Sequence, residues 1–273
     1  MNNLNIMNHK YFFMGGLQRS GSTLLSAILQ QNPEIYVSEN SPICDLTYKL
    51  NQLFDNNYQY NSCPFENRRI NVVKSLIDNY YYDVSESIII DKFRSWGTHY
   101  NISMIEALYD QKVKIICPVR SITEILTSWI TLFNKNKNHV SYIDKLITEK
   151  VENIDDVRCD LLMNMDGGIL HQMYAMDLCR NPSFNEVFHI VEYEDLISNP
   201  SNEIEKIYDF LKIKKYTHKF NNIKFNAKSR DTDYFGTPGL HEVRKYISKI
   251  SKDPNDVLSE TVLTKYSGLE FWR

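Results

Sequence analysis

Residues suited to anion chemistry are concentrated in one glycine-bearing turn near the start of the chain. Arg19 lies between Gly16 and Gly21, and the hydroxyls of Ser22 and Thr23 follow at once. An arginine presents a rigid, permanently charged fork of donors, and the two hydroxyls add further donors beside it. If a helix starts here, its free backbone N–H groups point at the same spot. The turn is therefore predicted to bind a phosphate or a sulfate group.

The same turn nearly matches the P-loop pattern, in which Gly, four residues and a second Gly precede Lys and Ser or Thr. Gly16 and Gly21 have the required spacing, but Ser22 occupies the lysine position. A nucleoside triphosphatase needs that lysine on the terminal phosphates, whereas the cation here is Arg19, inside the loop. A plain glycine turn in an α/β protein is the simpler alternative. It leaves the coincidence of strand, glycines, arginine and hydroxyls unexplained.

A second arginine is followed by a hydroxyl at helical spacing in the middle of the chain. Arg120 comes after the apolar stretch 113–119, and Ser128 lies eight residues later. This spacing is about two turns of a helix, so the charged fork and the hydroxyl can meet one ligand that lies across that helix. A lone arginine after a strand is more often a salt-bridge partner or a surface residue. In combination with the first turn, an anion site is the favoured interpretation.

Short apolar runs alternate with stretches of helical spacing, which predicts strands separated by helices. Strands are expected at 11–14, 87–91, 113–119 and 186–191. Helices are expected at 24–29, from about 42, and at 67–82, 102–108, 122–133, 157–180 with a break at Gly167–Gly168, 202–211, 240–250 and 258–266. Loops or irregular segments are expected at 34–41, 51–67 and 220–239. This order predicts an α/β fold: a mostly parallel central sheet flanked by helices, in one domain over 1–273, with the ligand beyond the carboxyl ends of the strands.

The composition is that of an ordinary globular protein and limits the possible partners. The chain has 273 residues, 42% of them hydrophobic, and a net charge of −3, which gives no general attraction to nucleic acid or membranes. No run of 18 apolar residues occurs, so no membrane span is expected. The five cysteines lack a CxxC pair and the seven histidines lack a metal-binding spacing. These features favour free thiols, a cytoplasmic location and no bound metal.

The glycine-bearing turn resembles a loop of a known enzyme family. The 5′-phosphosulfate loop of sulfotransferases that use 3′-phosphoadenosine 5′-phosphosulfate (PAPS) is similar to Gly16-Leu17-Gln18-Arg19-Ser20-Gly21-Ser22-Thr23-Leu24-Leu25, followed by Asn32-Pro33. The similarity is greatest to the tyrosylprotein sulfotransferase-like branch, whose loop reads Pro-Arg-Ser-Gly-Thr-Thr-Leu. The resemblance implies the P-loop-like sulfotransferase fold and transfer of a sulfuryl group from PAPS to an acceptor hydroxyl, leaving 3′,5′-ADP (PAP), without a metal. Tyrosylprotein sulfotransferases carry a Golgi membrane anchor, whereas residues 1–10 form a polar tail, so a cytoplasmic location is expected.

The resemblance also assigns residues to the nucleotide. The 5′ end of PAPS would lie on Gly16, Gln18, Arg19, Ser20, Gly21, Ser22 and Thr23. Arg120 and Ser128 would bind the 3′-phosphate and thereby select PAPS over ATP. Tyr193, in a Tyr-Glu-x-Leu turn, would contact the nucleotide or simply pin its own turn. Arg244 and Lys245 would reach the 3′-phosphate, with solvated surface charge as the default for both.

Catalytic roles are implied for a small set of residues. Glu39 stands where the tyrosylprotein branch has its general base and would take the proton of the acceptor hydroxyl, while a surface acid or a partner of Arg19 is the alternative. Lys92, in a turn that resembles the family's Lys-Asp-Pro-Phe region in a different order, would act with Arg19 near the leaving phosphate oxygen. His241 is the reserve base, because other sulfotransferases use a histidine. Trp96 would stack on adenine or fill the core, and the core is favoured.

Two other functions and several acceptors remain open. A P-loop-type kinase or phosphotransferase would turn over ATP with magnesium, and a non-catalytic nucleotide-binding protein would bind PAP without transfer. The acceptor is a saccharide, a lipid, a small alcohol or phenol, or a peptide tyrosine. The segments 46–67 and 134–166 are expected to build the acceptor pocket, and 213–273 to close over the nucleotide.

Overall fold

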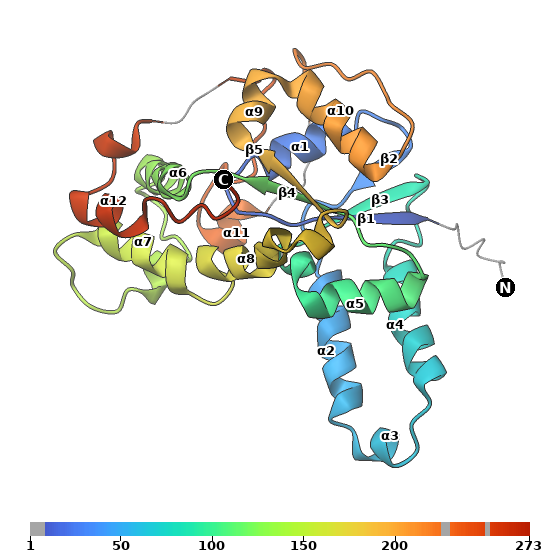
Figure 1. The fold of residues 1–273 in the computed structure, drawn as a ribbon. Helices are drawn as coiled ribbons and strands as arrows, with labels where there is room; N and C mark the ends of the chain where they lie inside the picture. The colour runs from blue at the N-terminus through green and yellow to red at the C-terminus, as the bar shows by residue number, and fades with distance from the viewer. Residues whose placement is uncertain (1–8, 225–229, 249–251) are drawn as a thin grey trace.

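A parallel sheet forms the centre of the protein. The computed structural model describes residues 9–224, 230–248 and 252–273, and within these ranges five strands pair in the order β2-β3-β1-β4-β5 (Figure 1). They are β1 (Lys10–Met14), β2 (Ile35–Val37), β3 (Ile88–Lys92), β4 (Ile115–Val119) and β5 (Phe188–Glu192). Every pairing is parallel. The predicted α/β fold with a parallel sheet is confirmed.

Helices cover both faces of the sheet (Figure 1). They are α1 (Ser22–Leu29), α2 (Ile43–Asp55), α3 (Tyr58–Ser62), α4 (Glu66–Tyr80), α5 (His99–Tyr109), α6 (Ile122–Lys135), α7 (Ile154–Asn164), α8 (Ile169–Met176), α9 (Tyr193–Ser198), α10 (Pro200–Leu211), α11 (Asp231–Phe235) and α12 (Glu260–Tyr266). Side chains of β1 alternate between two cores: Phe12 and Met14 pack with α1, α9 and α10, whereas Tyr11 and Phe13 pack on the opposite side. The break between α7 and α8 falls at Gly167–Gly168, as predicted. No helix in the described part of the chain is both long and apolar enough to cross a bilayer.

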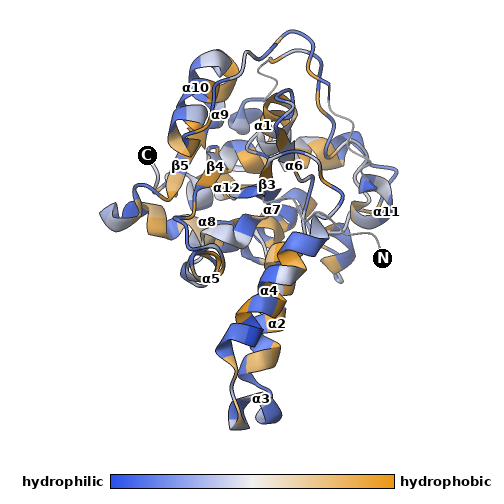
Figure 2. Ribbon diagram, turned by 90° about the vertical axis from the view of Figure 1, so that its right-hand side faces the viewer, coloured by the Kyte–Doolittle hydropathy of each residue, from blue (hydrophilic) through white to orange (hydrophobic). Residues whose placement is uncertain are grey.

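Helices α2 and α4 run side by side and project from the body as an arm, with α3 at its tip (Figures 1 and 2). The prediction of a loop over 51–67 is therefore wrong. The polar side chains in this stretch suggested a loop, but several of them form contacts between α2 and α4. Nε of Arg69 donates to Oδ1 of Asn51 at 2.9 Å, and Nη1 of Arg69 contacts Asp55 at 2.6 Å. None of the residues in 51–67 lines the cavity described below.

Two shorter predictions are also corrected. The loop expected at 34–41 contains the edge strand β2, which pairs with β3; three residues are too few to show the alternation typical of a strand. The helix expected at 240–250 is absent from its described residues, 240–248. There the carbonyl oxygen of Lys245 accepts the backbone N–H of Ile223 at 2.9 Å, so this carbonyl group bonds to an earlier segment of the chain.

Two predicted core residues are confirmed. Trp96 is 1% exposed, and its ring lies 4.4 Å from that of Phe13. Cys117 is fully buried in β4, and all five cysteines are free thiols. Trp96 therefore belongs to the core and is not available to stack on a nucleotide.

The sheet brings four turns to one edge, because the carboxyl ends of parallel strands meet there. Arg19 lies in the turn after β1, Arg94 in the turn after β3, Arg120 directly after β4, and Tyr193 directly after β5. These turns supply the framework of the site.

Candidate active site

The loop between β1 and α1 turns sharply because three of its residues adopt left-handed backbone conformations. Gly16, Arg19 and Gly21 have φ angles of 73°, 56° and 83°. A Cβ atom on Gly16 would lie 2.3 Å from the carbonyl oxygen of Pro118, and one on Gly21 would lie 2.8 Å from the ring of Tyr193. Only glycine fits at these two positions. Arg19 adopts a conformation that costs a side-chain-bearing residue about 1 kcal/mol, and such strain is concentrated at functional sites.

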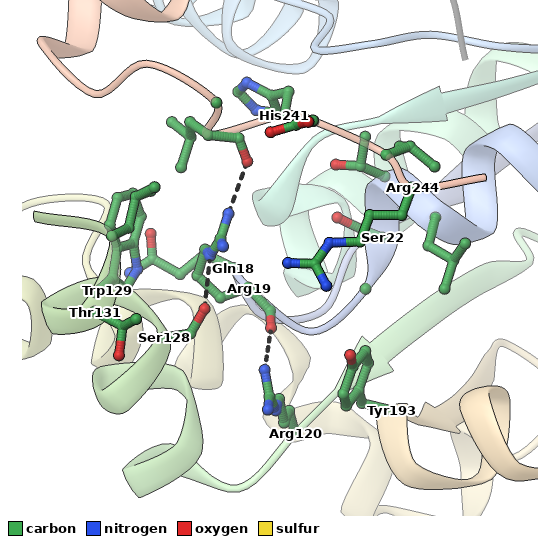
Figure 3. Close-up of a pocket in the computed structure, with 18 of the residues that line it drawn as sticks. Gln18, Arg19, Ser22, Arg120, Ser128, Trp129, Thr131, Tyr193, His241 and Arg244 are labelled. Carbon is green, nitrogen blue, oxygen red and sulfur yellow. Dashed lines mark hydrogen bonds between the residues drawn. The ribbon is translucent and has the colours of Figure 1, made fainter. Parts of the chain in front are cut away.

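The side chain of Arg19 reaches across the cavity to two later parts of the chain (Figure 3). Its Nε donates to Oγ of Ser128 at 3.1 Å, and its Nη1 donates to the carbonyl oxygen of Leu240 at 2.7 Å. The guanidinium carbon lies 5.6 Å from the centre of the Trp129 ring. Burial and the nearby charge of Arg120 lower the pKa of Arg19 to about 10. Two cations held this close together indicate a site prepared for an anion.

Arg120 lies against the same loop. Its Nη1 donates to the carbonyl oxygen of Arg19 at 3.4 Å, and its Nε donates to Glu124 at 3.4 Å. The guanidinium carbon lies 4.3 Å from the centre of the Tyr193 ring. The remaining nitrogen, Nη2, is buried without a hydrogen-bond partner among the described residues. Because a buried charged donor without a partner is costly, this nitrogen is suited to a ligand oxygen. The two anion sites predicted from the sequence therefore adjoin each other.

Arg94 adds a third guanidinium to the start of α1. It begins the 3-10 turn Arg94–Gly97 that follows β3. Its Nη1 donates to the carbonyl oxygen of Gly15 and its Nη2 donates to Oγ of Ser22, both at 3.0 Å. Burial lowers the pKa of its guanidinium to about 10.

These groups line one cavity of about 470 Å³ at the carboxyl edge of the sheet (Figure 3). Of the site residues predicted from the sequence, it is lined by Gln18, Arg19, Gly21, Ser22, Thr23, Arg120, Ser128, Tyr193, His241 and Arg244. Among the described residues, six lysine and arginine side chains line the cavity: Arg19, Arg94, Arg120, Lys135, Arg244 and Lys252. Glu242 is the single acidic residue among the described residues that line it. The cavity is therefore locally positive in a chain of net charge −3.

The remaining predicted residues lie outside the set that lines this cavity. Gly16 and Ser20 are internal to the loop, where the Ser20 hydroxyl donates to the carbonyl oxygens of Leu17 and Pro118. Lys245 is exposed. Glu39 is exposed and Lys92 is buried, each close to the cavity without lining it.

Lys92 ends β3 and is 2% exposed. Burial and the charge of Arg94 lower the pKa of its ammonium group to about 7, and the carboxylate of Glu39 opposes this shift. The backbone N–H of Lys92 donates to Oγ of Ser38 at 2.7 Å, which fixes the segment that carries Glu39 beside the end of the strand. A lysine with a pKa near neutrality can donate or accept a proton.

His241 is paired with Asp231. Its Nδ1 lies 2.6 Å from Oδ1 of Asp231, and its backbone N–H donates to Oδ2 at 3.0 Å. Its Nε2 lies 3.5 Å from Nδ2 of Asn40, the residue after Glu39. Asp231 is 8% exposed, so its carboxylate fixes the orientation of the imidazole in a partly buried setting.

Arg94, Asp231 and Gln172 belong to this region and were not predicted from the sequence. Arg94 carried a usable signal, because it stands in a strand-exit turn like Arg120. Gln172 contributes its Oε1 as acceptor for the backbone N–H of Gln18 at 2.8 Å, across 154 positions of sequence. Neither Gln172 nor Asp231 lies in a sequence pattern that would indicate a role in the site.

No three His, Cys, Asp or Glu side chains in the described ranges lie together in a way that would hold a metal ion. The expectation of a metal-free reaction stays a prediction.

Comparison with known proteins places this geometry in one family. The family described as "Sulfotransferase domain" matches residues 10–253. Mouse sulfotransferase SULT7A1 complexed with PAP is 14% identical over 95% of this chain and 81% of that chain, with a TM-score of 0.52. Retinol dehydratase in a complex with retinol and PAP is 13% identical over 96% and 81%, with a TM-score of 0.50. The sulfotransferase domain of the Synechococcus PCC 7002 olefin synthase is 20% identical over 92% and 86%, with a TM-score of 0.49.

At these identities the structures of SULT7A1 and retinol dehydratase show the fold, and they confirm the P-loop-like sulfotransferase fold. No curated protein matches the sequence. The family match does not favour a kinase, and membership of the tyrosylprotein branch stays a prediction. Since the match spans both arginine sites and most of the chain, this protein belongs to the sulfotransferase family and is a sulfotransferase enzyme.

Proposed function

We propose that this sulfotransferase moves a sulfuryl group from PAPS to an acceptor hydroxyl. The observation that carries the proposal is the adjoining pair of anion sites, in which Arg120 lies 3.4 Å from the backbone of Arg19 within one cavity. A nucleotide with phosphate groups at both its 5′ and 3′ positions engages both sites. A nucleotide without the 3′-phosphate would leave Nη2 of Arg120 buried and without a partner.

The residues present fit such a ligand. The N–H groups at the start of α1, the hydroxyls of Ser22 and Thr23, and Arg94 would hold the 5′ end. Arg120 and Ser128 would hold the 3′-phosphate. The structures of SULT7A1 and retinol dehydratase contain PAP, which supports PAPS as the donor.

The chain supplies the groups that the transfer requires. The acceptor oxygen forms a bond to sulfur as the bond from sulfur to the 5′-phosphate oxygen breaks, and the acceptor loses its proton. Nε2 of His241 would take that proton, and Asp231 would stabilise the imidazolium that results. Arg19 would stabilise charge on the transferred group. Lys92, with a pKa of about 7, would be able to protonate the leaving phosphate.

Glu39 is the other candidate for the base. It matches the base position of tyrosylprotein sulfotransferases, and its carboxylate interacts with Lys92. Because His241 lines the cavity and Glu39 does not, we assign the role of general base to His241.

The test is the selectivity of binding between PAP and AMP, measured by isothermal titration calorimetry. Arg120→Ala should weaken PAP binding by about 100-fold, since a charge-assisted pair is lost, and change AMP binding little. Arg68→Ala removes an exposed arginine on the arm and should change neither. Equal losses for PAP and AMP in Arg120→Ala would refute the assignment of the 3′-phosphate.

A further inference from the structure

We infer that residues 270–273, here called the tail segment, hold the 3′-phosphate site in place, with Glu270 and Arg273 as positioning residues. The inference rests on the proposed function. The tail segment follows α12 and lies beside the start of α6 and the end of β5 (Figure 1). It therefore contacts the elements next to Arg120 and Tyr193, although Glu270 and Arg273 do not line the cavity themselves.

Glu270 fixes the start of α6. Its Oε1 accepts the backbone N–H of Ile122, the first residue of the helix, at 2.8 Å across 148 positions of sequence. The side chain of Ser121, the N-cap residue, forms no capping hydrogen bond. A carboxylate at this end of a helix satisfies a free donor and is favoured by the helix dipole. Because Arg120 is only two residues before Ile122, this bond also restrains the backbone of Arg120.

The guanidinium of Arg120 depends on such support from its backbone. Its hydrogen bonds to Glu124 and to the carbonyl oxygen of Arg19 are both 3.4 Å long. Hydrogen bonds of this length are weak, since N–H···O distances usually lie at about 2.7–3.2 Å. The direction in which the side chain leaves the sheet is therefore set mainly by the backbone at the end of β4. That direction decides where Nη2, the nitrogen proposed to bind the 3′-phosphate, is presented.

Arg273 fixes the end of β5 in a similar way. Its Nε and Nη2 donate to the two carboxylate oxygens of Glu192, at 3.2 and 2.9 Å, and Nη2 also lies 3.5 Å from Glu194. A two-point contact of this kind restricts the orientation of both groups. Glu192 and Glu194 flank Tyr193, whose ring lies 4.3 Å from the guanidinium carbon of Arg120. Arg273 therefore holds the turn from which Tyr193 covers Arg120.

The tail segment can connect these two contacts because it is itself anchored. The backbone N–H of Arg273 donates to the carbonyl oxygen of Glu270 at 3.3 Å, which closes one turn. Between them, Phe271 and Trp272 pack against the core. Since β4 and β5 are paired neighbours in the sheet, a single turn spans the distance between their carboxyl ends.

The negative charge of Glu270 makes the inference testable, because a positioning role and a pure charge role predict opposite effects. If only charge matters, removing a carboxylate near the phosphate strengthens PAP binding. We expect instead that Glu270→Ala weakens PAP binding by about fivefold, the scale of a lost helix cap, and changes AMP binding by less than about twofold. Glu270→Gln keeps an acceptor oxygen for Ile122 and should bind PAP at least as tightly as the unchanged enzyme. Isothermal titration calorimetry with PAP and AMP measures these affinities.

Arg273 is tested by a substitution that keeps its charge. Arg273→Lys loses the two-point contact with Glu192, and we expect it to weaken PAP binding by about threefold and to leave AMP binding unchanged. The matched control is Lys265→Ala, which removes a similarly exposed cation from its pair with Asp160 and should change neither affinity.

The ratio of PAP affinity to AMP affinity separates the outcomes. If Glu270→Ala lowers only the melting temperature and leaves this ratio unchanged, the tail segment is merely structural and the inference is wrong. Tighter PAP binding in both Glu270 variants, or full PAP affinity in Arg273→Lys, would assign the effect to charge and also overturn it. If Glu270→Ala does not fold, Arg273→Lys decides the question. If the unchanged enzyme binds PAP no better than AMP, the proposed function itself fails.

Discussion

Glu194 lies behind the arginine that is proposed to bind the 3′-phosphate. Its neighbour Tyr193 stacks on Arg120, which also donates to Glu124. Burial, followed by the neighbouring carboxyl group of Glu124, raises the pKa of Glu194 to about 7. Arg273 contacts Glu194 from the other side at 3.5 Å. Glu194 therefore changes its charge near neutral pH, beside Arg120.

PAP affinity should fall as the pH rises through 7. Glu194 is protonated below its raised pKa, and a bound 3′-phosphate favours that neutral form further, so binding is linked to proton uptake. We expect a loss of about 10-fold between about pH 6.5 and about pH 8.5, measured by calorimetry. Glu194→Gln should flatten this dependence, and Glu205→Gln, an exposed acid on α10, should retain it. An unchanged pH profile in Glu194→Gln would exclude this coupling.

Substitution of single residues also tests whether His241 or Glu39 accepts the proton of the acceptor hydroxyl. His241→Gln should lower kcat by about 10²-fold, the usual scale of a general base, and change PAP affinity less than about threefold. Asp231→Asn should lower kcat as well, because the imidazole loses its orienting carboxylate. Glu39→Gln should retain most activity. The reverse pattern in steady-state kinetics, with Glu39→Gln inactive and His241→Gln active, would transfer the role to Glu39.

At the scale of elements, the β1–α1 loop packs against the turn after β5, through the contact of Gly21 with the Tyr193 ring. Gly21→Ala would drive a Cβ atom into the Tyr193 ring, whereas Gly167→Ala, also at positive φ, would meet nothing within 4 Å. Both variants should lose thermal stability from backbone strain, and Gly21→Ala should lose more because its Cβ atom meets the Tyr193 ring. Only Gly21→Ala should also weaken PAP binding, by about 10-fold or more, since Tyr193 must move off Arg120. Equal PAP affinities in the two variants would show that the contact is irrelevant to binding.

The elements themselves could be predicted where the local pattern is strong. Apolar runs predicted β1, β3, β4 and β5, and helical spacing predicted α6 and α10, with ends within a few residues of those in the structure. The edge strand β2 is too short to show a pattern, and the polar arm helices are stabilised by contacts such as Arg69 to Asn51 that no local window contains. The late segment after Gly239 resembles a helix in spacing, but the carbonyl oxygen of Lys245 accepts from the backbone of Ile223, which no local window contains.

For the whole molecule, the parallel sheet made much of the site predictable. The rule that ligands lie beyond the carboxyl ends of parallel strands predicted that Arg19 and Arg120 would share one edge of the sheet. Tyr193 was assigned to the nucleotide by the family resemblance alone. Contacts across long sequence distances were not predictable in the same way. Arg19 bonds to Leu240 across 221 positions, and His241 is oriented by Asp231 from a segment that showed no regular pattern.

The order of the elements along the chain also determines when the site is completed during synthesis. All five strands precede α9, so the sheet and both arginine sites leave the ribosome first. Phe235, Leu240 and His241 emerge afterwards and complete the far side of the cavity. Substitutions in this late region would therefore change the far side of the cavity and leave the residues of the two arginine sites unchanged.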